Sequence, residues 1–198
     1  FRGVTMVRID RVHTGGGDSG ESSLVDGSRR SKSDARFSVV GDCDELNSLL
    51  GVARMECARV PMRHRDGGDR KGAGRVHFIC DSALSRVQHE LFDLGAELAC
   101  PPENLPDFMV LINDDQSDVL VSDMDAWLSQ TEPLTSFILP AGGPPQAMLH
   151  HARTVTRRLE RNIVRLRDIE GENSDRPLVL TYVNRLSDWL FVLSRWIT

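Results

Sequence analysis

The chain has 198 residues, of which 40% are hydrophobic and 27% charged, and its formal net charge is −5. This composition is typical of a globular protein with a buried core, and the length fits a single domain over residues 1–198. The acidic balance argues against nucleic-acid binding, and the sequence has no run of about 18 apolar residues that could span a membrane.

The first 35 residues differ from the rest of the chain. Residues 1–35 are rich in glycine, serine and aspartate and lack helical periodicity, although the alternating residues 7–12 could form a short extended piece. We therefore expect an irregular amino-terminal segment, followed by a helical region over residues 36–198.

Beyond residue 36, apolar residues recur at three- and four-residue steps in five stretches. A polar, glycine-rich break at 61–74 predicts a loop after the first stretch. Pro101 and Pro102 end the second stretch, and Pro145 lies in the first turn of the fourth. The pattern predicts an all-α, up-and-down bundle of about five helices with an irregular glycine-rich amino-terminal segment.

The segment 14–23 has a composition suited to phosphate binding. Glycine permits turns with positive φ that aim successive N–H groups at an anion, and Lys32 could add a positive charge. A flexible tail is the alternative, and composition alone favours it. A Walker-A loop is excluded because no Gly-Lys-Ser/Thr triplet occurs, and no βαβ pattern supports the Rossmann-like glycine spacing that ends at Gly20.

The fourth predicted helix has a charged face. At 100° per residue, its polar side chains at Arg153, Arg157, Glu160 and Arg161 project within a sector of about 100°, opposite apolar residues. Guanidinium groups bind triphosphate oxygens in bidentate geometry. The alternative is a solvated face with i,i+4 ion pairs, which is the commoner outcome for such a pattern.

Other polar residues allow more than one interpretation. Asp42, Asp44 and Glu45 are interpreted as opening the first helix, where the helix dipole favours acidic side chains. Asn184 could contact an adenine edge or a ribose, or join a hydrogen-bond network in the core. The histidine pair at 150 and 151 lacks the Glu-x-x-His spacing of a di-iron bundle, so we interpret it as structural or exposed.

Several motifs in a distinctive order resemble the PduO-type ATP:cob(I)alamin adenosyltransferases. They are Thr14-x-x-Gly17-Asp18-x-Gly20-x-Ser22-Ser-Leu24, Asp26-Gly-Ser-Arg-x-x-Lys32, Gly41-Asp-x-Asp44-Glu-Leu-Asn-Ser48, Gln88-x-Glu-Leu-Phe-Asp-Leu-Gly95, Phe137-Ile-Leu-Pro140-x-Gly-Gly143, His151-x-Arg153-Thr-x-x-Arg157-Arg-x-Glu160-Arg161 and Asn184-Arg-Leu-Ser-Asp188. The resemblance extends over about residues 7–196.

The resemblance implies a helical bundle that assembles as a homotrimer, with active sites between neighbouring subunits. The residues it implies in ATP binding are Thr14, Gly15, Gly16, Gly17, Asp18, Ser22, Lys32, Arg157, Arg158, Glu160, Arg161 and Asn184. Asp44 and Arg153 would form a salt bridge across the subunit interface. Phe137 would bind cobalamin by crowding the lower face of the corrin ring.

The resemblance also implies transfer of the 5′-deoxyadenosyl group of ATP to cob(I)alamin, with release of triphosphate. Cobalt(I) is itself the nucleophile, so the protein would supply positioning and would stabilise the leaving triphosphate. Arg157, Arg161, Lys32 and a Mg²⁺ ion on the phosphates would carry this role. Displacement of the lower axial ligand by Phe137 would ease the reduction of cobalt(II). We place Arg157, Phe137, Arg153 and Asp44 in the catalytic set.

Two other functions stay open at this stage. One is a non-catalytic module that senses or delivers adenosylcobalamin, and the other is a structural bundle with a disordered arm. An adenosylcobalamin-dependent client enzyme and a reductase are expected partners. Four widely spaced cysteines give no disulfide framework, so we expect a cytoplasmic protein, or one of the mitochondrial matrix if an upstream targeting peptide has been removed.

Overall fold

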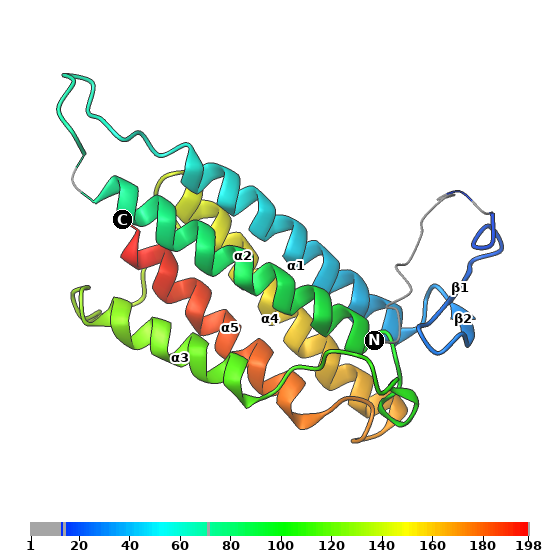
Figure 1. Cartoon of the computed structure of the whole chain (residues 1–198). Helices are drawn as coiled ribbons and strands as arrows, with labels where there is room; N and C mark the ends of the chain where they lie inside the picture. Colours follow the sequence, from blue (N-terminus) through cyan, green and yellow to red (C-terminus); the bar gives the residue numbers. More distant parts are fainter. Residues whose placement is uncertain (1–12, 14, 71, 198) are drawn as a thin grey trace, which may run out of the picture.

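The structure, a computed structural model, describes residues 13, 15–70 and 72–197. Its described part is an elongated helical bundle with a small hairpin at one end (Figure 1). The helices are α1 (Ala35–Ala58), α2 (Ala73–Leu98), α3 (Asp114–Leu128), α4 (Pro144–Glu170) and α5 (Pro177–Trp196), with a 3₁₀ turn at Pro102–Asn104. The strands β1 (Glu21–Ser23) and β2 (Arg29–Ser31) pair antiparallel. The all-α bundle predicted from periodicity is confirmed.

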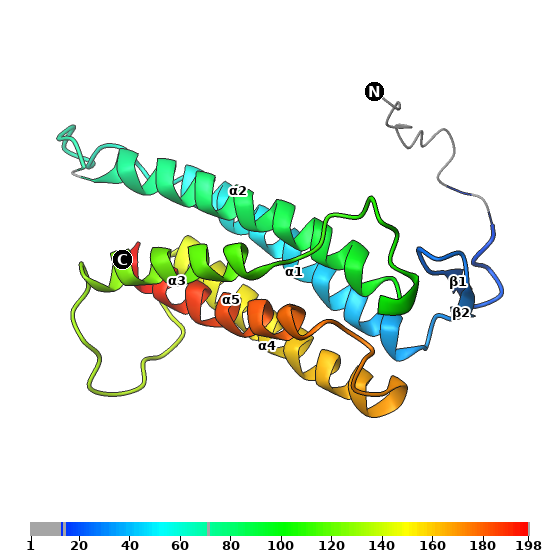
Figure 2. The ribbon, with the colours of Figure 1, turned by 60° about the horizontal axis from the view of Figure 1, so that its bottom comes forward.

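The helices pack through their apolar faces into one core. α1 packs against α2 and α4, α4 packs against α5, and α5 packs against α3. Figure 2 shows α1 and α2 on one side of the bundle and α3, α4 and α5 on the other. The predicted apolar side of α4 is buried, including Val155, Leu159 and Ile163. This packing leaves the charged side of α4 facing outwards.

Local sequence explains where the helices begin. Asp34 caps α1, because its side chain accepts a hydrogen bond of 2.8 Å from the backbone N–H of Arg36. Asn113 and Gln116 form a capping box at the start of α3. α4 and α5 each begin with a proline, at Pro144 and Pro177.

The early start of α1 corrects one interpretation. Since α1 begins at Ala35, Asp42 and its acidic neighbours lie beyond the first turn and do not open the helix. The side chain of Asp42 is buried and accepts hydrogen bonds from Arg158 Nε at 2.8 Å and from Asn162 Nδ2 at 2.6 Å. Asp42 therefore links α1 to α4, and the helix dipole does not explain its position.

The irregular segment predicted for residues 1–35 contains a hairpin that periodicity did not indicate. The hairpin is docked on the bundle: the backbone N–H of Val25 donates to Ala99 O at 3.0 Å, and Asn104 Nδ2 donates to Asp26 Oδ2 at 2.9 Å. Leu24, next to these contacts in the chain, is buried. The extended piece predicted at 7–12 lies outside the described residues.

Three further expectations can be compared with the described chain. The loop predicted at 61–74 is confirmed, although α2 already begins at Ala73. The cysteines are buried free thiols. In the described ranges, no helix combines the length and the apolar character needed to cross a membrane.

Candidate functional site

The glycine-rich loop folds back on the hairpin through polar contacts. Gly15 and Gly20 have φ angles of 71° and 84°, a region that favours glycine. Lys32 closes the loop, because its Nζ donates to Gly17 O at 2.8 Å and its backbone N–H donates to Gly20 O at 2.8 Å. A Cβ atom at Gly17 would lie 2.8 Å from Lys32 Nζ, so any side chain there would displace the ammonium group. Thr14 lies outside the described residues.

The two strands of the hairpin place Ser22 opposite Arg30. Side chains that are directly opposite in an antiparallel pair lie on the same face, and here this face is the less exposed one. Arg30 forms an ion pair with Glu170 at the end of α4. On the other face, Arg29 Nη2 donates to Gly16 O at 2.8 Å. The glycine loop is therefore attached to a strand pair that itself contacts the bundle.

The middle of α4 presents the predicted charged row to solvent. Arg157 and Arg161 are exposed, and Arg161 Nη1 donates to the backbone O of Arg157 at 2.9 Å. The guanidinium group of Arg157 makes no hydrogen bond or ion pair within the part of the chain that the structure describes. Two cationic groups on neighbouring turns, with free donors, can bind the oxygens of an extended polyphosphate.

A hydrogen bond joins α4 to α5 beside this row. Asn184 Nδ2 donates to Glu160 Oε1 at 2.8 Å, and both residues line a cavity of about 390 Å³. Arg167, Thr181 and Arg185 also line this cavity. The amide of Asn184 keeps its oxygen near Arg185 Nη1, at 3.3 Å. This polar groove suits a ligand that carries both hydroxyl and amine groups.

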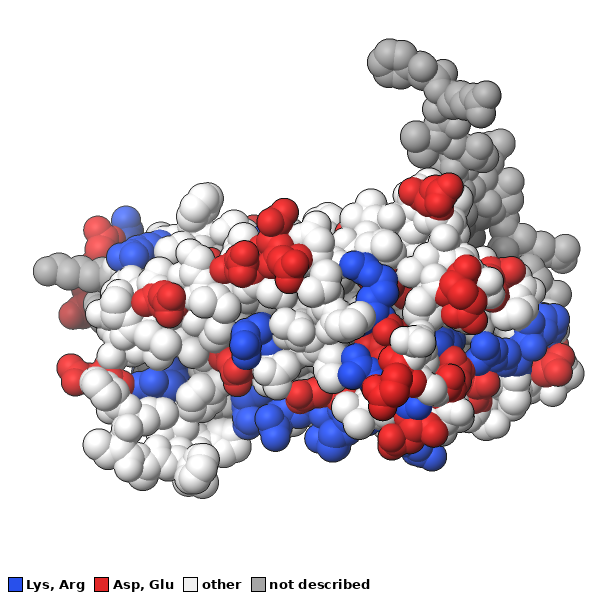
Figure 3. All heavy atoms as spheres, turned by 90° about the horizontal axis from the view of Figure 1, so that it is seen from below, with Lys and Arg blue, Asp and Glu red and all other residues white. Residues whose placement is uncertain are grey.

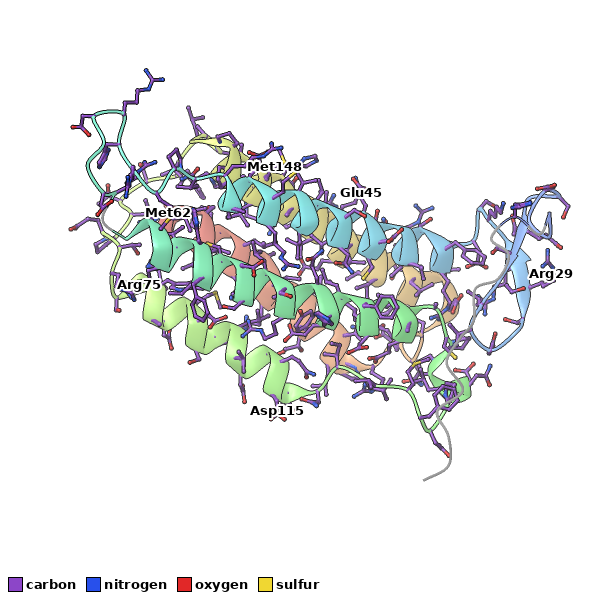
Figure 4. The ribbon with its side chains drawn as sticks, turned by 45° about the horizontal axis from the view of Figure 1, so that its top comes forward. Arg29, Glu45, Met62, Arg75, Asp115 and Met148 are labelled. Carbon is purple, nitrogen blue, oxygen red and sulfur yellow. The ribbon has the colours of Figure 1, made fainter. Side chains whose placement is uncertain are left out.

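Arg158 lies on a different side of α4 from Arg157 and Arg161. Its guanidinium group forms ion pairs with Asp42 at 2.8 Å and with Glu45, which Figure 4 labels on α1. Hydrogen bonding to Asp42, followed by the charges of Asp42 and Glu45, raises the pKa of Arg158. The structure thus gives Arg158 a role in joining α4 to α1, and its predicted contact with ATP stays a prediction.

A second cavity, of about 450 Å³, lies beneath the loop between α3 and α4. Phe137 is fully exposed in this loop, and Figure 3 shows the loop as a largely uncharged lobe that projects from the bundle. The remaining lining residues are Leu134, Ser136, Ile138, Pro140, His150, Arg153 and Phe191. This composition suits a large, mainly apolar ligand with some polar groups.

Two buried polar atoms in the wall of this cavity have no hydrogen-bond partner among the residues that the structure describes. They are Nδ1 of His150 and Nε of Arg153. Burial, and then the charge of Arg153, lowers the pKa of His150, so its imidazole is held in the neutral form. Unsatisfied buried polar atoms are uncommon in native proteins, and these two leave donor or acceptor capacity at the cavity wall that a ligand or water can use.

Asp44 and Arg153 do not meet within one chain. Asp44 is exposed on α1 and lines an apolar depression with Phe37, Val40 and Phe92. Arg153 instead lines the cavity under Phe137. In the described ranges neither residue takes part in an ion pair, so opposite charges stand without partners on two separate surfaces.

Sequence reasoning missed several residues around these sites. Phe191 lines the cavity under Phe137, and the apolar period of the last helix gave no reason to single it out. Glu170 and Arg36 gave no signal, since a single charge near a helix end is usually solvated. Only the folded chain shows that Glu170 forms ion pairs with both Arg30 of the hairpin and Arg36 of α1.

Comparison with known proteins places the chain among enzymes that act on corrinoids. The sequence model of the cobalamin adenosyltransferase family matches residues 12–197. The corrinoid adenosyltransferase of Mycobacterium tuberculosis is 38% identical over 190 residues, which cover 96% of this chain and 89% of that protein.

Solved structures agree with this match. A PduO-type ATP:corrinoid adenosyltransferase from Lactobacillus reuteri, with one phenylalanine replaced by alanine and complexed with cobalamin and ATP, is similar with a TM-score of 0.79 and 27% identity. The match covers 94% of this chain and 93% of that chain. A variant of the Lactobacillus reuteri enzyme with arginine replaced by lysine, complexed with ATP, gives a TM-score of 0.77 at 28% identity, over the same shares of the two chains.

Proposed function

We propose that this chain, which belongs to the cobalamin adenosyltransferase family, transfers the 5′-deoxyadenosyl group of ATP to the cobalt of a reduced corrinoid. The observation that carries this function is the match over nearly the whole chain to adenosyltransferases, one of them solved with cobalamin and ATP together. These relatives are named as adenosyltransferases, which favours a catalytic function over a sensing or delivery module.

The reaction asks for charge stabilisation more than for acid–base chemistry. The electron pair of cobalt(I) forms the bond to the ribose 5′-carbon, and the bond from that carbon to oxygen breaks as triphosphate leaves. Arg157, Arg161 and Lys32 would stabilise the negative charge that grows on the triphosphate. Asn184 and Glu160, already joined by a hydrogen bond, would orient the nucleoside.

The two halves of this site lie at opposite ends of one chain. Arg153 lines the cavity under Phe137, whereas Glu170 contacts the hairpin through Arg30, and these two positions on α4 are about 25 Å apart at 1.5 Å per residue. Figure 1 shows the hairpin and the α3–α4 loop at opposite ends of the bundle. Reacting atoms must come within about 3–3.5 Å, and ligands held at these two ends of one chain would start far from each other.

We therefore infer that the hairpin of one copy acts with the α4 row and the Phe137 loop of a neighbouring copy. A homotrimer with three such interfaces satisfies this requirement by closed symmetry. Asp44 and Arg153 support the arrangement, because each is a charge without an ion pair inside the described chain. A pair between Asp44 of one copy and Arg153 of the next would fix the two halves of the site against each other.

Phe137 is the residue we assign to the lower face of the corrin ring. Its side chain is fully exposed over an apolar cavity, which is unfavourable unless a ligand or a neighbouring copy covers it. An aromatic ring against the corrin would exclude the lower axial ligand, and a four-coordinate cobalt(II) accepts an electron more easily.

Magnesium would enter this site together with ATP. The described residues contain no cluster of three or more His, Cys, Asp or Glu side chains that could hold a metal ion. Mg²⁺ commonly keeps several waters and binds phosphate oxygens with one or two carboxylates. Asp18 in the glycine loop is a carboxylate that could serve such an ion.

The test is an anaerobic spectroscopic assay with chemically generated cob(I)alamin, MgATP and the purified protein. We expect an ATP-dependent loss of cob(I)alamin absorbance, a light-sensitive product and stoichiometric inorganic triphosphate. Saturable ATP binding without any of these changes would contradict the transferase and support the sensing or delivery module.

A further inference from the structure

We propose that Glu170, at the end of α4, is a positioning residue for the hairpin that carries the ATP-binding loop. Its carboxylate pairs with Arg30 of β2 and with Arg36 of α1 at the same time. One side chain therefore joins the hairpin, the start of α1 and the end of α4. This inference rests on the proposed function of the glycine loop.

The side chain of Arg36, to which Glu170 is paired, is held rigidly in the core. It is 0% exposed, and it donates to Leu98 O at 3.0 Å, to Cys100 O at 3.4 Å and to Ser174 O at 2.9 Å. Glu170 is the carboxylate that pairs with this buried cation. Because breaking a buried ion pair leaves an uncompensated charge, the Arg36–Glu170 contact keeps the Glu170 carboxylate in place.

Arg30 connects that fixed carboxylate to the nucleotide loop. It lies opposite Ser22 in the strand register, on the inner face of the hairpin. Two residues later, Lys32 closes the glycine loop through its bonds to Gly17 O and Gly20 O. A shift of Arg30 would therefore move Ser22 and Lys32 together, two of the residues assigned to ATP.

The Arg30–Glu170 ion pair lies near the surface and not in the core. The side chains of Arg30 and Glu170 are 28% and 19% exposed, so the pair is partly screened. Arg30 also forms a longer ion pair, of 3.5 Å, with Asp34 at the start of α1, and the turn of the hairpin is attached separately, where Val25 bonds to Ala99. Without Arg30, the hairpin would keep the turn contact and could pivot about it. ATP binding would then have to offset the entropy lost when the glycine loop becomes ordered, and the affinity for ATP would fall.

Arg30→Met tests the joint, because methionine keeps an apolar stem and leaves the Arg36–Glu170 pair intact. We expect KM and Kd for ATP to rise roughly two- to fivefold, the range for a partly exposed ion pair. We expect kcat at saturating ATP, KM for the corrinoid and the unfolding midpoint to stay as in the wild type. Arg30→Lys should restore most of the ATP affinity.

A matched control and a second background separate this role from a general effect on stability. Arg63→Met, on the exposed loop before α2, should change neither KM. In a Glu170→Gln background, Arg30→Met should weaken ATP binding less than it does in the wild type, because only the longer pair with Asp34 is then left to lose. An unchanged Kd for ATP in Arg30→Met, an equal rise of both KM values, or a full additional effect in the Glu170→Gln background would each overturn the inference.

The two proposals fail in different ways. Calorimetric titration with MgATP measures Kd without turnover, so the Arg30→Met comparison holds whether or not the wild type makes product. A wild type that binds ATP but forms no adenosylcobalamin would contradict the proposed function only. A wild type that turns over, with an unchanged Kd in Arg30→Met, would contradict the positioning role only.

Discussion

The hairpin end and the α3–α4 loop end of the bundle are built in opposite ways. At the hairpin, Lys32, Arg29 and Arg30 are all engaged in hydrogen bonds or ion pairs with the loop or the bundle. In the α3–α4 loop, residues 132–143 are all exposed, and Phe137 and Leu139 are among the most exposed large side chains. One end is tied down by polar contacts, and the other presents apolar surface.

The difference follows from the two ligands. A triphosphate is recognised by donors at fixed positions, so a loop that is already ordered lowers the cost of binding. A corrin ring is a broad, largely apolar surface, and burial against it needs area more than fixed geometry. We infer that the nucleotide end is preformed in each chain, whereas the corrinoid end is completed by the ligand and the neighbouring copy.

The largest expected effect comes from removing the positive charge of Arg157, which lies between the hairpin end and the α3–α4 loop end of the bundle. Arg157→Ala should lower kcat by about 10²–10³-fold, the usual cost of one donor to a developing anion. Because the side chain is exposed and makes no hydrogen bond or ion pair in the described chain, circular dichroism should show an unchanged fold. An unfolded variant would sink the assignment of Arg157 to the phosphates.

Mixing variants tests whether the two ends come from different copies. Lys32→Ala chains and Arg157→Ala chains should each be nearly inactive alone. After the two are unfolded and refolded together, some interfaces would combine an intact hairpin with an intact α4 row, and activity should return in part. If the mixture stays as inactive as its components, the site lies within one chain.

A smaller effect should separate the corrinoid end from the nucleotide end. Phe137→Ala should leave Kd for ATP unchanged and lower turnover from cob(II)alamin with a limiting reductant. The lower axial ligand would return to cobalt(II) and slow its reduction, so the loss should be smaller than for Arg157→Ala and confined to the assay that starts from cob(II)alamin. Equal turnover from cob(II)alamin in wild type and variant would rule out this role.

The smallest effect concerns the wall of the corrinoid cavity. Since the pKa of His150 is lowered in the folded chain, the unfolded chain binds the proton more readily. The stability that neutral His150 contributes is therefore present above pH 6.5 and is lost as the pH falls through 6.5 towards the lowered value. His150→Gln should reduce the drop in Tm between pH 7.5 and pH 5.5, and parallel curves for wild type and variant would contradict this.

Sequence periodicity predicted the helices and the orientation of α4 well. Val155, Leu159 and Ile163 recur at helical spacing, and only one orientation buries them while leaving Arg157 exposed. The start of α1 was placed late because Phe37 and Ser38 carry no clear period, although Asp34 is a good capping residue. Misplacing that boundary led to the wrong interpretation of Asp42.

The hairpin could not be predicted in the same way. Its strands are three residues each, too short for a period-two signal, and they are polar on both faces. Its stability comes from contacts with residues distant in sequence, such as Ala99 and Glu170. The assignment of individual residues to ATP came from the family resemblance, because composition alone favoured a flexible tail.

The length of α4 has a consequence for mixed assemblies of intact and damaged chains. Its middle carries Arg157 and its end carries Glu170, which holds the hairpin of the same chain through Arg30. In a ring of three copies, these two parts of one helix would serve different catalytic centres. In such a ring, one chain whose α4 is damaged at both positions would impair two of the three centres, so mixed rings would lose more activity than their share of defective chains.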